Sequence, residues 1–161
     1  MVVGVISDTH GLIRPEAIEA LGGSELIVHA GDVGDVAVLE RLRAIAPTVA
    51  VRGNVDTAPW ARVLPRTEVV AVGTLHVYVV HDLSALDLDA RAAGFAAVIS
   101  GHTHRASADM KNGVLFLNPG SAGPRRFALP VTLARLRIEG AQLSHEIVDL
   151  SAPASTSPLH A

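Results

Sequence analysis

The 161-residue sequence contains no cysteine, and aromatic side chains make up only 3% of it. The absence of cysteine excludes disulfide frameworks and thiolate zinc sites. The net charge is −3 and like charges do not cluster, so we expect no general nucleic-acid binding. The longest apolar stretch, residues 69–80, is interrupted by Gly73, Thr74 and His76 and falls short of the ~20 residues of a membrane span.

The sequence also shows little that would act as a targeting signal to another compartment. Its first residues carry no positive charge, and the apolar run ends at Ser7, too early for a secretion signal, so we expect a cytoplasmic protein. Hydrophobic residues make up 49% of the sequence, enough for one well-packed core in a chain of this length. We predict a single domain over residues 1–150 and a flexible tail over residues 151–161, which are rich in Ser, Pro and Ala.

Strand and helix patterns alternate in the first third of the chain. Short apolar runs predict strands at 2–7, 26–29 and 48–52, separated by a helix from Pro15 to Gly22 and a helix capped by Asp35 that ends before Pro47. This order is typical of a parallel sheet with helices on its faces. Because parallel strands of this kind are buried on both faces, the runs are apolar throughout.

Hairpin patterns dominate the rest of the chain. They pair 68–72 with 75–80, two apolar runs around Asn112-Gly113, and 131–138 with 142–148, while a buried strand is expected at 97–100 and a short helix from Ser84 to Gly94. The excess of strands over helices in this half predicts a second sheet stacked on the first.

Five polar clusters follow predicted strands at their carboxyl ends. They are Ser7-Asp8-Thr9-His10, Gly31-Asp32, Gly53-Asn54-Val55-Asp56, His81-Asp82 and Gly101-His102-Thr103-His104. Ligands of α/β sheets bind beyond the carboxyl ends of the strands, so these clusters are expected to converge on one rim.

The side chains in these clusters are typical of divalent-metal ligands. Carboxylate, amide and imidazole groups without sulfur favour hard or borderline ions, and four imidazoles favour transition metals. Asp8 with His10, and His102 with His104, are spaced so that each pair could chelate. Glycines directly precede three of the candidates, which permits close backbone approach. The isolated histidines are expected to be structural or surface residues: His29, His76, His145 and His160.

The combination and order of these clusters resemble the calcineurin-like metallophosphoesterase superfamily. The matching residues are Asp8-x-His10, Gly31-Asp32, Gly53-Asn54, His81 and Gly101-His102-x-His104, and the following Asn118-Pro119-Gly120-Ser121 is similar to the small YfcE-like phosphodiesterase group. The resemblance implies an α/β fold, a four-layer α/β/β/α sandwich with two stacked mixed sheets. It also implies a metal-dependent enzyme that hydrolyses phosphodiester bonds in a small diester or nucleotide-like substrate.

The resemblance further implies a dinuclear metal site. Asp8, His10, Asp32 and His104 would hold the first ion, and Asp32, Asn54, His81 and His102 the second. Two transition-metal ions are expected, Mn²⁺ first and otherwise Ni²⁺, Fe²⁺ or Zn²⁺. A pair of such ions can activate a bridging hydroxide and clamp the phosphoryl oxygens. After Asp8, Asp32 and that hydroxide are counted, one positive charge remains, which favours a diester; Arg125-Arg126 could help to bind phosphate.

We expect Asp32, Asn54 and Asp56 to be the catalytic residues. Many superfamily members follow the metal-binding Asn with a His that assists the leaving group, whereas this chain has Val55 there. Asp56 is therefore the first candidate for that acid, and we expect slow turnover of poor leaving groups. A second departure is Asp82, which follows His81 where the group generally has Gly. It is expected either to cap the next helix or to orient a ligand histidine.

Three other functions are compatible with the sequence. One is a phosphomonoesterase or nucleotide phosphatase, and another is a metal-binding regulator without turnover. The third is a non-catalytic interaction scaffold like Vps29, a member of the superfamily with altered ligand positions. The intact set of seven ligand positions in this sequence argues against the scaffold. The oligomeric state is also open, with a homodimer among the alternatives.

Overall fold

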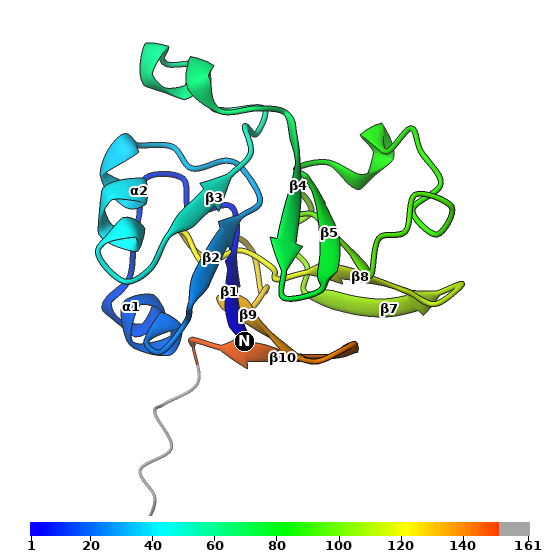
Figure 1. The fold of residues 1–161 in the computed structure, drawn as a ribbon. Helices are drawn as coiled ribbons and strands as arrows, with labels where there is room; N and C mark the ends of the chain where they lie inside the picture. The colour runs from blue at the N-terminus through cyan, green and yellow to red at the C-terminus, as the bar shows by residue number, and fades with distance from the viewer. Residues whose placement is uncertain (152–161) are drawn as a thin grey trace, which may run out of the picture.

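A computed structural model describes residues 1–151, and its core consists of two five-stranded mixed sheets packed face to face (Figure 1). The elements are β1 (Val2–Ile6), α1 (Pro15–Leu21), β2 (Leu26–His29), α2 (Val36–Arg43), β3 (Thr48–Ala50), the 3₁₀ helix η1 (Pro59–Val63), β4 (Thr67–Val72), β5 (Leu75–Val80), the 3₁₀ helix η2 (Leu83–Ala85), β6 (Ala97–Ile99), β7 (Ser107–Lys111), β8 (Val114–Asn118), β9 (Thr132–Glu139) and β10 (Gln142–Asp149). The α/β class and the second sheet are thus confirmed. The predicted tail lies outside the described residues, apart from Ser151.

The first sheet has the order β10-β9-β1-β2-β3, and β1, β2 and β3 run parallel. The central strand β1 is buried on both faces, because Val3 and Val5 point into the core between the sheets whereas Ile6 packs under the helices. Gly4 lets α1 approach closely, since a Cβ there would lie 2.5 Å from Leu21 Cδ2. The predicted cap of α2 is present, with Asp35 accepting a hydrogen bond from the Ala37 amide.

The second sheet has the order β4-β5-β6-β8-β7, with β5, β6 and β8 parallel and one antiparallel strand at each edge. Both predicted hairpins of this sheet are present. Asn112 and Gly113 join β7 to β8, both with positive φ (51° and 80°), as a tight hairpin turn requires. Valines of β5 and leucines of β8 complete the core that joins the sheets.

The prediction of a helix from Ser84 to Gly94 is wrong. The segment contains only η2, capped by Asp82 rather than Ser84, followed by turns. Its apolar residues Leu86, Leu88 and Ala90 pack on the outer face of the second sheet. Helices therefore cover the first sheet, whereas a mostly irregular segment covers the second (Figure 1). The α/β class with two stacked mixed sheets is thus as predicted, and within residues 1–151 the layer over the second sheet contains η2 and turns.

The two sheets position the polar clusters. The parallel strands β1, β2 and β3 of one sheet and β5, β6 and β8 of the other end at the same rim. Between the sheets, the His102 amide donates to Asp8 Oδ2 at 3.0 Å, and His81 Nδ1 lies 2.7 Å from the Ala30 carbonyl. Asp8 N donates to Gly31 O at 3.0 Å within the first sheet, and Gly101 N donates to His81 O at 2.9 Å within the second. No helix in the described residues is long and apolar enough to cross a membrane.

Candidate metal centre

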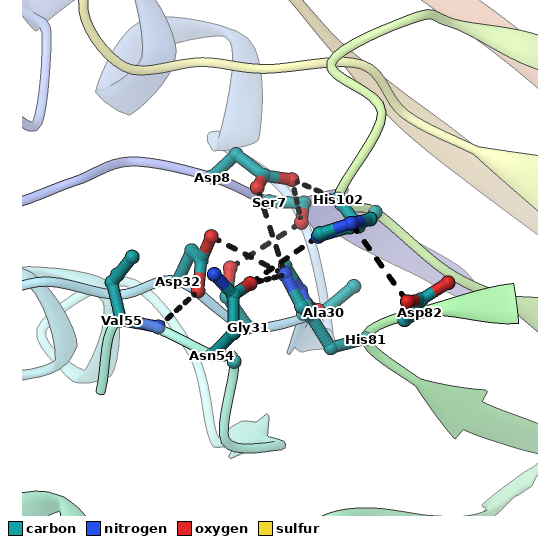
Figure 2. Close-up of polar contacts among 12 residues, drawn as sticks. Ser7, Asp8, Ala30, Gly31, Asp32, Asn54, Val55, His81, Asp82 and His102 are labelled. Atoms are coloured by element: carbon teal, nitrogen blue, oxygen red, sulfur yellow. Dashed lines mark hydrogen bonds and ion pairs between the residues drawn. The ribbon is translucent and has the colours of Figure 1, made fainter. Parts of the chain in front are cut away.

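All seven predicted ligands converge on this rim, in two neighbouring groups. Asp8, His10 and His104 form one group and Asp32, His81 and His102 the other, with the candidate ligand atoms of each group within 4.8 Å of one another. The seventh residue, Asn54, reaches the second group, where its Oδ1 lies 3.1 Å from His81 Nε2 and 3.2 Å from His102 Nδ1. Figure 2 shows Asp8, Asp32, Asn54, His81 and His102 pointing toward one another.

The two carboxylate oxygens of Asp8 have different surroundings. Its Oδ2 accepts hydrogen bonds from the Ser7 hydroxyl at 2.6 Å and from the His102 amide at 3.0 Å. Its Oδ1 is buried without any hydrogen-bond partner and lies 3.3 Å from His104 Nε2. Burial raises the pKa of this carboxyl, although the Ser7 bond opposes the effect. A buried carboxylate oxygen without a partner is costly, and a bound cation would satisfy it.

Asp32 lies between the two groups. Its Oδ2 is 3.3 Å from His81 Nε2 and 3.8 Å from His10 Nε2, whereas its Oδ1 accepts a hydrogen bond from the Val55 amide at 3.0 Å. Burial opposes ionisation of this carboxyl, but the bonds from His81 and Val55 outweigh it and lower its pKa to about 2. Asp32 is therefore an anion at neutral pH, with one oxygen within reach of both groups.

The first group presents neutral imidazoles. Burial lowers the pKa of His10 and of His104, and the positive charge of Arg126 adds to both effects. Their Nε2 atoms face each other at 3.3 Å. Two ligands of one zinc ion lie roughly 3–3.5 Å apart, so this spacing fits shared coordination. The charge of Arg126, one member of the predicted Arg125-Arg126 pair, thus acts on both histidines of this group.

The second group is oriented by the backbone. The Nδ1 atom of His81 lies 2.7 Å from the Ala30 carbonyl, so it donates its proton there and leaves Nε2 facing Asp32 and Asn54 (Figure 2). Burial opposes the charged form of His81, but Asp32, Asp8 and the Ala30 carbonyl together raise its pKa. Such an arrangement selects the tautomer that binds metal through Nε2.

The backbone of the centre is strained in a way that aims its ligands. Five of the seven residues have φ in the left-handed region, between 46° and 73°: Asp8, His10, Asp32, His102 and His104. Residues other than Gly rarely adopt this region of φ, and such backbone strain concentrates at functional sites. Gly53 and Gly101 are required for lack of space. A Cβ at Gly53 would lie 2.1 Å from Asp32 Oδ1, and a Cβ at Gly101 would lie 2.0 Å from Ser7 Oγ.

Asp56 is engaged by the backbone. Its carboxylate accepts hydrogen bonds from the amides of Gly53 at 2.8 Å, Gly34 at 3.0 Å and Val33 at 3.2 Å, and the residue is 4% exposed. These bonds tie the loop that carries Asn54 to the loop that carries Asp32. Both carboxylate oxygens are occupied, so this geometry argues against the free leaving-group acid expected from the sequence and favours a positioning role.

The other departures from the family pattern also have defined contacts. Val55 contributes its amide to Asp32, and the residue is 44% exposed. Asp82 caps η2 through the Ser84 amide at 3.0 Å, as one of the two expectations had it. Its other oxygen lies 3.8 Å from His102 Nε2 (Figure 2), so the same residue also borders a ligand histidine.

Several residues around the centre support it without being among the residues predicted from the sequence. Asn118 donates to the Gly101 carbonyl at 2.9 Å, and Ser121 donates to the Asp8 carbonyl at 2.9 Å, so the loop after β8 braces two ligand loops. The Asn118-to-Ser121 motif was the signal in the sequence from which these two supporting residues could have been predicted. Three arginines beside the centre, Arg52, Arg62 and Arg66, were also missed, although they cluster around Asn54 in the sequence.

His29 lies beneath the centre and is fully buried. Its Nδ1 accepts from the Gly31 amide at 3.1 Å, so its Nε2 donates to Thr9 Oγ1 at 2.9 Å. Burial lowers the pKa of His29 to about 3. The expectation that His29 is a structural residue is thus confirmed.

This fold and this rim of aspartates and histidines define a metallophosphoesterase-type site. The family model for the calcineurin-like phosphoesterase superfamily domain matches residues 1–141, and the chain belongs to this family. A probable metallophosphoesterase of Methanothermobacter thermautotrophicus is 37% identical over 169 aligned positions, which cover 98% of this chain and 97% of the relative.

Solved structures give the same picture of the fold. An archaeal phosphodiesterase has a TM-score of 0.76 and 24% identity, covering 92% of this chain and 100% of its own. YfcE, a phosphoesterase from E. coli, has a TM-score of 0.70 and 23% identity over 94% of each chain. Vps29 from Entamoeba histolytica, in complex with zinc, has a TM-score of 0.71 and 25% identity over 93% of this chain and 99% of its own.

Proposed function

We propose that this protein is a metal-dependent phosphodiesterase with a dinuclear centre. The observation that carries the proposal is the buried Asp8 Oδ1, which lacks a partner yet faces the imidazole of His104. Together with the neutral imidazoles of His10 and His104 and an ionised Asp32, it forms a donor set that fits divalent cations. Membership of the calcineurin-like family supports the same chemistry.

Asp8, His10, Asp32 and His104 would hold one ion, and Asp32, Asn54, His81 and His102 the other. Asp32 is the shared ligand, because its Oδ2 reaches toward histidines of both groups. Four imidazoles favour transition metals, with Mn²⁺ as the first candidate. When bound, two such ions supply a water nucleophile activated near neutral pH and neutralise charge that builds up on the phosphoryl oxygens.

The charge of the centre favours a diester substrate. Asp8 and Asp32 are the carboxylates among the proposed ligands, so two divalent ions would keep a net positive charge that a singly charged diester can neutralise. Arg126, which lowers the pKa of His10 and His104, adds positive charge on the side of the first group. Among the clusters described above, no side chain is free to protonate a leaving group, so we infer slow turnover unless the leaving group is good.

Two alternatives make different predictions. A phosphomonoesterase would use the same ligands with a doubly charged substrate, for which Arg126 would have to supply further charge. A Vps29-like scaffold would have no need of all seven ligands, yet in this chain all of them are retained and converge. The convergence therefore favours an enzyme.

The experiment compares bis(p-nitrophenyl) phosphate with p-nitrophenyl phosphate, using protein stripped with chelator and refilled with Mn²⁺. Asn54→Ala serves as the contamination control. We expect metal-restored cleavage of the diester that exceeds cleavage of the monoester and is lost in the variant. Faster cleavage of the monoester would favour the phosphatase. Bound metal with no hydrolysis of either substrate would favour a scaffold or a regulator.

A further inference from the structure

A cleft of about 820 Å³ opens beside the metal centre, on the side of Asn54, His81 and His102. Ligand sites of roughly 300–1,000 Å³ typically enclose an entire small molecule. The cleft is therefore much larger than a single phosphate needs. If the reacting phosphate lies at the metal centre, the cleft is the space for one of the two groups esterified to it.

Three of the residues that line the cleft are arginines from the segment 52–66, which we call the arginine wall. Arg52 follows β3, Arg62 lies on η1 and Arg66 immediately precedes β4, and all three line the cleft. Arg52 is half-buried and its amide donates to the Pro65 carbonyl at 2.8 Å, which ties the two ends of this wall together. Within residues 1–151, none of the three guanidinium groups forms an ion pair with a carboxylate.

The acidic groups that line the cleft do not form ion pairs with this wall. Asp56 is bound by three backbone amides, and Asp82 is bound by the Ser84 amide and hydroxyl. Asp87 lies on the segment that follows β5, not on the segment that carries the arginines. It forms no ion pair with any of the three arginines. The Tyr78 side chain also lines the cleft, and its hydroxyl has no hydrogen-bond partner within the described part of the chain.

We infer that the arginine wall binds a second anionic group, a phosphate, on the arm of the diester that does not react. Three guanidinium groups without ion-pair partners on a concave wall suit a phosphate, which accepts paired hydrogen bonds from arginine. The substrate class is then a phosphodiester that carries a further phosphate, as in a nucleoside bisphosphate ester. This inference rests on the proposed function, because it places the scissile phosphate at the neighbouring metal centre.

The test uses two substrates that differ only in the second phosphate. They are the p-nitrophenyl ester of thymidine 5′-phosphate and the same ester with an additional 3′-phosphate. Hydrogen bonds to charged groups predict a kcat/KM about 10- to 100-fold higher for the second substrate, expressed mainly in KM. Arg62→Gln/Arg66→Gln should reduce this preference, measured as the ratio of the two kcat/KM values in the same variant, to about twofold or less.

The control is Arg41→Gln/Arg43→Gln, which removes the same charge from exposed positions at the end of α2, outside the cleft. It should retain the full preference, which separates a local site from a general effect of net charge. Equal kcat/KM for the two substrates in the wild type would overturn the inference, as would a preference that survives in Arg62→Gln/Arg66→Gln.

A binding measurement separates this inference from the proposed function. Calorimetric titration of the Mn²⁺-loaded protein should show tighter binding of thymidine 3′,5′-bisphosphate than of thymidine 5′-phosphate, and the difference should disappear in Arg62→Gln/Arg66→Gln. If that holds but no ester is hydrolysed, the anion site stands and the proposed function fails. If bis(p-nitrophenyl) phosphate is hydrolysed without any such difference in binding, only the anion site fails.

Discussion

At the residue scale, Asp56 shows how contacts decide the role of a carboxylate. Its three backbone hydrogen bonds hold the Asp32 loop against the Asn54 loop. From the sequence it was the first candidate for a leaving-group acid, because it follows Val55 where many relatives have a histidine. The spacing along the chain indicated a polar group near the centre, but only the fold shows that the backbone occupies both of its oxygens.

Replacing Asp56 distinguishes the two roles. Asp56→Asn should lower the free energy of unfolding by about 2 kcal/mol or more, because the amide nitrogen cannot accept the bonds that a carboxylate oxygen accepted. It should also slow the cleavage of alkyl and nitrophenyl diesters by the same factor. Urea denaturation and the two rates provide the measurements. A selective loss of alkyl-diester cleavage, with stability unchanged, would restore the acid.

Asp8 allows a test of the unpartnered oxygen. In Asp8→Asn, the amide oxygen can keep the bonds from Ser7 and the His102 amide, and the new NH₂ can donate to His104 Nε2. Removing a buried charge should therefore stabilise the metal-free protein by about 1 kcal/mol while Mn²⁺ binding is lost. Thermal unfolding with chelator and with Mn²⁺ measures both effects. A metal-free variant much less stable than the wild type would show that the charge is already satisfied within the protein.

At the scale of elements, the loops after the parallel strands approach one another too closely for side chains at their glycines. Gly53 has an ordinary φ, yet its Cβ would lie 2.1 Å from Asp32 Oδ1 and 2.2 Å from Asp32 N. Gly53→Ala should thus abolish Mn²⁺ binding and destabilise the protein by roughly 1–3 kcal/mol through overpacking. Calorimetric titration with Mn²⁺ and urea denaturation measure the two effects.

Gly22→Ala is the matched control for this prediction. Gly22 also has a negative φ, and its added Cβ would meet only the Glu19 carbonyl at 3.1 Å, away from the centre. Normal Mn²⁺ affinity is expected for this variant. Unaltered metal binding in Gly53→Ala would mean that the two ligand loops can separate without loss of the site.

The segment after β5 shows where local patterns mislead. Ser84-Ala-Leu-Asp87 resembles a helix start, but the following apolar residues Leu86, Leu88 and Ala90 are spaced two apart and pack on the second sheet. That period suits an extended segment with one face buried. Burial of this face prevailed over the capping pattern, because most helical stability comes from tertiary packing of an apolar face.

At the scale of the whole molecule, the buried His29 links global stability to pH. Its pKa is about 3 in the folded protein against 6.5 for an ordinary histidine, so the unfolded chain binds more protons below pH 6.5. The contribution of His29 is therefore fully present above that pH and is lost as the pH falls toward 3. The expected slope is about 1.4 kcal/mol per pH unit between about pH 6 and pH 3.

Comparison with His29→Gln isolates this effect. Urea denaturation between pH 4 and pH 7, in the presence of chelator, should give a shallower loss of stability in the variant because Gln does not titrate. Differences in the carboxylates cancel in the comparison. Parallel pH dependences for the two proteins would show that His29 is protonated without unfolding.

The sequence by itself determined the strands, both α-helices and, through the resemblance of its motifs to the metallophosphoesterase family, the seven candidate ligands. Those features depend on local patterns: apolar runs, caps, and polar residues at strand ends. What only the tertiary structure decided depends on contacts between distant segments, such as the tether at Asp56, the unpartnered oxygen of Asp8 and the arginine wall of the cleft. The physical reason is that a residue's type fixes which bonds it can form, whereas the packing of the two sheets fixes which partners are within reach.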